Sequence, residues 1–233
     1  MSDSNAHAGH RARMRDRYLN NGLDGFQDHE ILEMILYNCY TRRNTNDIAH
    51  KLLDTFGSIS AVLEAPVDLL IEAGVSETVA VTLKMIPDIC RVYYDDRNSN
   101  KDKILLLADL GSYFVNKFIG RMDECLYLLL LDSKGKELFC GVVSYGSVSS
   151  SDVPVRKIVD LSLRYNAANA VIAHNHPSGV AIPSKADLYV TEVLFNTLKS
   201  VGVHLVDHII VADDEFASLR DTELSNVLII EKE

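Results

Sequence analysis

A chain of 233 residues, 47% of them hydrophobic, is long enough to bury one large core or two small ones. It has no apolar run of about 18 residues and no apolar stretch behind its first charges, so we expect no membrane-spanning helix, no secretory signal and a cytoplasmic location. The formal net charge of −10 is shared equally between residues 1–100 and 101–233, so neither half has the basic surface that generic nucleic-acid binding requires.

The first pattern along the chain is a set of four arginines at alternate positions. A helix would place Arg11 over Arg15 and Arg13 over Arg17. We interpret this pattern as a solvated helical face, and the alternative is a local basic patch.

Helical periodicity continues from residue 28 to about residue 97. Apolar residues recur at three-to-four spacing, Asp28 and Thr45 are the expected N-caps, and Gly57 is the expected C-cap. The polar segment DDRNSNKDK, residues 95–103, predicts a linker. The pattern therefore predicts a small all-α domain over residues 1–100.

One segment of this helical half, residues 74–86, resembles the second half of a helix-hairpin-helix, in which backbone amides of a glycine-rich loop hold DNA phosphates. This copy is degenerate. It has Ser76 where a second glycine is expected, Glu77 follows, and no basic residue flanks it before Lys84. We expect a docking or structural role, with DNA binding as the alternative.

The second half, residues 104–233, changes to alternating strands and helices. Strands over 125–132 and 137–146 flank the turn SKGK and predict a hairpin, after a helix over 105–119. The further elements expected in chain order are a helix over 155–165, a strand over 169–173, a helix over 185–199 and a strand over 203–211. This order predicts a mixed α/β domain with helices packed against one sheet.

The four cysteines lie far apart and form no CxxC pair, which favours buried, reduced thiols over a disulfide framework or a metal site. They are Cys39, Cys90, Cys125 and Cys140.

The segment AHNHPSGVAIPSKAD, residues 173–187, carries the candidate chemistry. His174 and His176 project from the same face of a strand, because strand side chains alternate with period two. The loop that follows is long enough to fold back and bring Asp187 to the same place. Two imidazoles, one carboxylate and an open position for water are typical of catalytic zinc.

These residues resemble a known motif. His174-x-His176, followed by Ser184 and Asp187, is similar to the JAMM motif of the MPN/JAB metalloenzyme superfamily. Within it, HNHPSG, PSKAD and VDHIIV resemble the RadC-type bacterial branch, and so do HRARMRDRYL, HEILEMIL and FGSISAVLEA in the helical half. The resemblance implies an MPN/JAB-like fold for residues 104–233.

The same resemblance implies one zinc ion per chain, held by His174, His176 and Asp187. It implies Glu124 as the general acid/base and Ser184 as a hydrogen-bond donor to the oxyanion of a tetrahedral intermediate. The expected activity is hydrolysis of an amide bond in a peptide or protein. The alternatives are a DNA repair or recombination accessory protein, whose zinc site is structural or vestigial, and a zinc-bearing scaffold.

Some of these residues have a second interpretation. Ser184 and Asp187 also have the spacing of a helix cap. Asn175 is expected to face away from the two histidines and to fix a loop. His204 and His208 are expected to be ordinary strand residues, with a contact between His208 and the metal ligands as the alternative.

The chain departs from the RadC pattern at one position in the helix before the HNHPSG strand. RadC-type sequences carry Arg-Glu there, whereas this chain has Arg156-Lys157. Asp160, on the same helix, is a poor geometric substitute for the missing glutamate.

Overall fold

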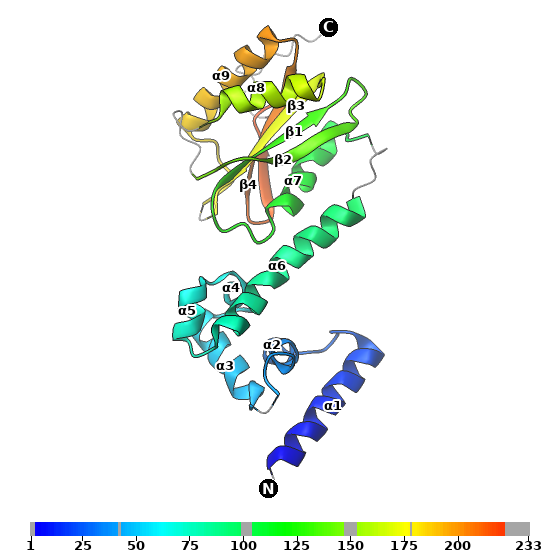
Figure 1. The fold of residues 1–233 in the computed structure, drawn as a ribbon, viewed down its shortest axis with the longest axis vertical. Helices are drawn as coiled ribbons and strands as arrows, with labels where there is room; N and C mark the ends of the chain where they lie inside the picture. The colour runs from blue at the N-terminus through cyan, green and yellow to red at the C-terminus, as the bar shows by residue number, and fades with distance from the viewer. Residues whose placement is uncertain (1–2, 42, 99–103, 147–152, 178, 222–233) are drawn as a thin grey trace. The chain divides into compact units, whose positions relative to one another are not determined.

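The computed structural model describes residues 3–41, 43–98, 104–146, 153–177 and 179–221 (Figure 1). Its contacts divide the chain into two compact units, Met1–Ile89 and Cys90–Glu233. No helix among the described residues is long and apolar enough to cross a membrane. The domain boundary expected near residue 100 stays a prediction, because residues 99–103 lie outside the described part.

The first unit is built from helices, which confirms the predicted all-α character of this part of the chain. Its apolar core is formed by fully buried side chains that include Leu32, Leu36, Leu52, Leu70 and Leu83. Its helices are α1 (Asp3–Asn21), α2 (Asp28–Tyr37), α3 (Thr45–Phe56), α4 (Ile59–Glu64), α5 (Val67–Glu72) and the first part of α6 (Glu77–Asn98). Because α6 extends to Asn98, residues 95–98 of the predicted linker are helical.

The helix ends follow local chemistry, with small shifts from the predicted caps. Gly57 is confirmed as the C-cap of α3, with a φ of 93° that favours glycine. The N-cap of α3 is Asn44, whose side chain accepts a hydrogen bond from the Asn46 amide, so the prediction of Thr45 was one residue late. Likewise, Gln27 rather than Asp28 precedes α2.

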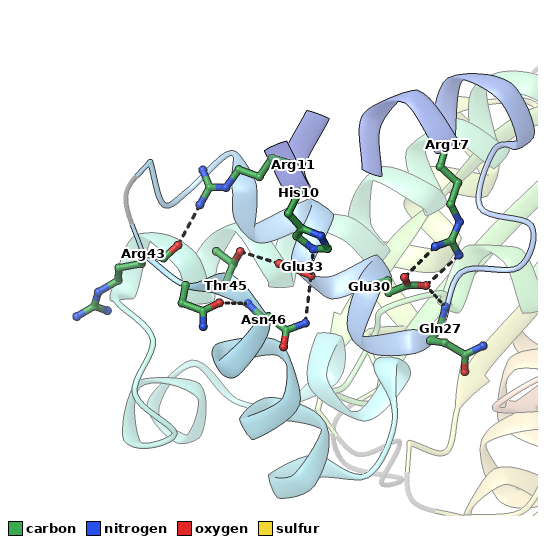
Figure 2. Close-up of polar contacts among 10 residues, drawn as sticks. His10, Arg11, Arg17, Gln27, Glu30, Glu33, Arg43, Thr45 and Asn46 are labelled. Carbon is green, nitrogen blue, oxygen red and sulfur yellow. Dashed lines mark hydrogen bonds and ion pairs between the residues drawn. The ribbon is translucent and has the colours of Figure 1, made fainter. Parts of the chain in front are cut away.

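A buried carboxylate connects three helices of this unit (Figure 2). Glu33 of α2 is only 2% exposed. It lies 3.2 Å from Nε2 of His10 on α1 and accepts hydrogen bonds from Thr45 Oγ1 at 3.4 Å and Asn46 Nδ2 at 3.3 Å, both on α3. Thr45 is thus the first residue of α3, and its hydroxyl donates to Glu33 instead of capping the helix.

Two of the four arginines of α1 are engaged within the same unit (Figure 2). Arg11 donates to the carbonyls of Thr41 and Arg43, at 3.2 and 3.0 Å. Arg17 forms a two-pronged ion pair with Glu30 at 2.8 and 2.9 Å. These contacts give Arg11 and Arg17 a structural role.

The second unit is built on a five-stranded mixed sheet in the order β2-β1-β3-β4-β5. β3 and β4 run parallel, and the other neighbours are antiparallel. The strands are β1 (Cys125–Leu131), β2 (Glu137–Tyr145), β3 (Asn169–Asn175), β4 (His204–Ala212) and β5 (Glu215–Ser218). The helical elements are the 3-10 turn η1 (Leu107–Asp109), α7 (Leu110–Phe118), α8 (Val155–Arg164) and α9 (Lys185–Ser200).

The predicted order of strands and helices is confirmed, and so is the mixed α/β class that the MPN/JAB-like resemblance implied. Two details differ. The short strand β5 was not predicted, and the helix expected from residue 105 begins as η1 at Leu107.

The two faces of the sheet have different partners. Leu126, Leu128 and Ile172 pack with residues of α8 and α9, such as Ile158 and Leu194. The alternate strand residues pack on the opposite face, with α7. His174 follows Ile172 by two residues and therefore faces the α8 and α9 side.

The structure corrects the expectation that the cysteine thiols are buried. All four cysteines are free, but Cys90 is exposed and only Cys125 is fully buried.

The Glu33 network gives a test of the first unit. We expect Glu33→Ala to lower its free energy of unfolding by about 1–3 kcal/mol, because the buried donors that bind this carboxylate lose their acceptor. Urea denaturation followed by far-ultraviolet circular dichroism measures the change. Glu72→Ala, at an exposed glutamate of the same unit, is the control and should leave the transition in place.

Candidate metal centre

The three expected ligands lie at the meeting point of β3 and α9. His174 is the second-to-last residue of β3. His176 directly follows the strand, and its amide donates to the carbonyl of Val211 at 2.8 Å. Asp187 lies in the first turn of α9. The sheet therefore supplies both imidazoles, and a helix start supplies the carboxylate.

Their side chains converge on one point. Nε2 of His174 lies 2.9 Å from Nε2 of His176 and 3.2 Å from Oδ1 of Asp187. Nε2 of His176 lies 3.8 Å from Oδ2 of Asp187. The three ligand atoms lie within 4.8 Å of one another, so one ion can contact all of them.

The chemistry of these groups suits a metal ion. Nδ1 of His176 lies 3.1 Å from the carbonyl of Val180, which can only accept, so a neutral His176 carries its proton on Nδ1 and has a free electron pair on Nε2. Two imidazole nitrogens and a carboxylate oxygen form a donor set that zinc accepts.

Asp187 is held as a carboxylate although it is 2% exposed. Burial raises its pKa, but the hydrogen bond and the charge of His174 in its protonated form, with hydrogen bonds from Ser184, outweigh burial and hold the pKa of Asp187 well below its usual value. The ligand is therefore ionised at neutral pH.

Ser184 and Asp187 also form a capping box at the start of α9. The Ser184 amide donates to Oδ2 of Asp187 at 2.7 Å, and Ser184 Oγ accepts from the Asp187 amide at 3.2 Å. Both interpretations of the Ser-x-x-Asp spacing therefore describe the same residues, because the cap holds Asp187 in place beside the histidines.

Two further side chains extend the site inward. One is His208, expected from the sequence only as an alternative partner of the ligands, and the other is Thr191, which was not predicted. Nε2 of His208, on β4, lies 2.8 Å from Nδ1 of His174, and Nδ1 of His208 lies 2.6 Å from Oγ1 of Thr191 on α9. His208 is completely buried, and desolvation lowers its pKa well below the usual value. The contacts thus support the alternative interpretation of His208, whereas His204 is exposed.

A signal for Thr191 was present in the sequence. Thr191 follows Asp187 by four residues, which places both on one face of α9. The signal for His208 was weak, because only the pairing of β4 beside β3 brings it under His174.

Glu124 lies just before β1, which pairs with β3. The register pairs Leu126 with His174, and Glu124 precedes Leu126 by two residues. The structure groups His174, His176 and Asp187 without Glu124, so the role of Glu124 stays a prediction.

Asn175 faces away from the histidines, as expected, and fixes the segment before β1. Its Oδ1 accepts from the Cys125 amide at 2.9 Å, and its Nδ2 donates to the carbonyls of Arg121 and Asp123 at 3.1 and 3.2 Å. The side chain is 4% exposed, so these three bonds lie in the interior. Asn175 thereby anchors the segment that carries Glu124.

Lys157 is bound to the edge of the sheet. Its Nζ donates to the carbonyl of Val143 on β2 at 2.9 Å. The residue that departs from the RadC pattern is therefore engaged with main chain.

Comparison with known proteins adds two findings. A family model described as RadC-like JAB domain matches residues 106–224. The chain is also 34% identical, over 224 residues, to UPF0758 protein FN0909 of Fusobacterium nucleatum subsp. nucleatum. The match covers 93% of this chain and 97% of that relative.

The Asn175 anchor can be tested by its stability. We expect Asn175→Ala to lower the free energy of unfolding by at least about 2 kcal/mol, because one amide and two carbonyls lose a buried partner. Thermal unfolding of the purified chain measures the loss. Asn116→Ala, which removes one exposed bond within α7, is the matched control, and an equal loss in both variants would contradict the anchor role.

Proposed function

This chain belongs to the RadC family, and from that membership and the geometry of the site we propose that it is a zinc-dependent hydrolase that cleaves an amide bond in a peptide or protein. The observation that carries the proposal is the convergence of His174, His176 and Asp187 within 4.8 Å of one another. A helix cap alone requires neither histidine.

His174, His176 and Asp187 would hold the zinc ion, one per chain. Bound by three protein ligands, zinc supplies Lewis-acid activation of water near neutral pH. The protein contributes a carboxylate that is already ionised and two imidazoles whose positions are set by one strand.

Glu124 would act as the general acid/base. This role is supported by its position directly before β1, two residues from Leu126, which pairs with His174. From there its carboxylate would accept the proton of the attacking water and return it to the leaving amine. The Asn175 anchor would keep the main chain on either side of Glu124 in position during this transfer.

Ser184 would donate a hydrogen bond to the oxyanion of the tetrahedral intermediate. Support for this role comes from its place beside Asp187, to which both its amide and its hydroxyl are bonded. The same contacts restrict where the hydroxyl can lie.

The alternative, a nucleic-acid accessory role in repair or recombination, has mixed support from the first unit. Arg11 and Arg17 are engaged with main chain and with Glu30. In favour of this alternative, Nζ of Lys51 lies 3.2 Å from the position that a Cβ atom at Gly74 would occupy. A basic residue therefore does lie beside the segment that resembles a helix-hairpin-helix. We favour the hydrolase because its chemistry uses residues from β3, α9 and the segment before β1 together.

Glu124 provides the test of hydrolysis. We expect zinc-loaded Glu124→Gln to keep its metal and to lose about 10²–10⁴-fold in the rate of peptide or isopeptide cleavage, because proton transfer loses its acceptor. A screen of peptides and isopeptide-linked conjugates, followed by mass spectrometry, first identifies a substrate. Asp123→Asn, at the exposed neighbouring acid, is the control and should keep the rate.

Metal content provides an independent test. We expect elemental analysis of the wild-type chain to find one zinc ion per chain, and His176→Ala to lose it during dialysis against a mild chelator, because one of three protein ligands is gone. His204→Ala, at the exposed histidine of β4, should retain the metal. Equal retention by both variants would remove His176 from the ligand set.

A further inference from the structure

We propose that Thr191 and His208 hold the proton of His174 on Nδ1 and thereby leave Nε2 free to bind the metal. The inference extends the proposed metal centre and makes both residues positioning residues, since neither lies among the three ligands. It rests on a chain of short contacts, Asp187 carbonyl to Thr191 to His208 to His174.

Thr191 decides in which direction these hydrogen bonds run. Its Oγ1 lies 2.6 Å from the main-chain carbonyl of Asp187 and 2.6 Å from Nδ1 of His208. A hydroxyl has one proton, and a carbonyl oxygen can only accept. The proton of Thr191 therefore goes to Asp187, and Oγ1 accepts from Nδ1–H of His208.

The consequence passes through both rings. Complete burial disfavours a charged imidazole, so His208 is neutral, and with its proton on Nδ1 it has only an electron pair on Nε2. The 2.8 Å contact then requires His174 to donate from Nδ1. Neutral His174 consequently has an electron pair on Nε2, and that atom faces His176 and Asp187.

The opposite direction is disfavoured by geometry. If Thr191 donated to His208, its oxygen and the Asp187 carbonyl oxygen would face each other at 2.6 Å without a proton between them. His208 would then donate to Nδ1 of His174, and the proton of His174 would occupy Nε2, where the metal binds. Only the direction set by the carbonyl leaves the ligand atom free.

The arrangement also joins two ligands through one helix turn. Thr191 lies four residues after Asp187 on α9, and its hydroxyl bonds to the carbonyl of that residue. Thr191 and His208 are both fully buried, so water does not compete for these bonds. The start of α9 therefore controls the carboxylate directly and the imidazole of His174 indirectly.

The test compares matched pairs of variants. Thr191→Val removes the hydroxyl at similar volume, and Thr191→Ser retains it. His208→Met replaces the ring nitrogen with a thioether, which accepts hydrogen bonds only weakly, and His208→Gln retains a strong acceptor at similar length. The zinc dissociation constant, measured by competition with a chromogenic chelator, should rise about 10–100-fold in Thr191→Val and His208→Met. It should return to within a few-fold of the wild-type value in Thr191→Ser and His208→Gln.

A direct measurement of proton position separates this role from a merely structural one. Imidazole ¹⁵N chemical shifts of the metal-free wild type at pH 8 should show His174 and His208 protonated on Nδ1, and Thr191→Val should shift His208 towards the Nε2–H form. A wild-type spectrum with His174 protonated on Nε2 overturns the inference. So do equal zinc affinities in each matched pair.

These outcomes are distinct from failure of the proposed hydrolysis. If the variants change zinc affinity and the proton positions are as stated, the inference stands even when no substrate is cleaved. If wild-type zinc affinity and cleavage are strong but all four variants match the wild type, the inference fails and the hydrolase proposal stands.

Discussion

The carboxylate of Asp187 serves two structures at once, and the geometry of the candidate site depends on that division. One oxygen accepts the amide of Ser184 and caps α9, while the other faces His174. The backbone at the start of a helix fixes where a capping side chain can lie, so the hydrogen bonds of the cap orient the Asp187 carboxylate.

Three consecutive residues at the end of β3 and directly after it project to opposite faces of the sheet. His174 and His176 project to one face, where α9 meets the sheet, and Asn175 projects to the other. From that opposite face Asn175 binds the main chain on either side of Glu124. The end of β3 therefore positions both imidazoles and the segment that carries the proposed acid/base. The alternation of strand side chains makes both attachments compatible.

The first unit is stabilised by a different device. Hydrogen bonds and ion pairs supplement its apolar core where one helix meets another. Glu33 joins α1, α2 and α3, and Arg11 closes the chain between α2 and α3 onto α1. These roles explain part of the charge pattern of α1 without a nucleic-acid partner.

The sequence by itself determined the elements whose signals are local. Period-two alternation put His174 and His176 on one face and Asn175 on the other, and the helix-start pattern singled out Ser184 and Asp187. The tertiary structure alone decided which distant side chains complete the site, because contacts between strands and helices far apart in the chain have no local periodicity. His208 acquired its place through the pairing of β4 beside β3, and the Thr45 hydroxyl bonds to Glu33 while Asn44 caps α3. Burial was likewise decided by packing, which left Cys90 exposed where composition alone suggested an interior thiol.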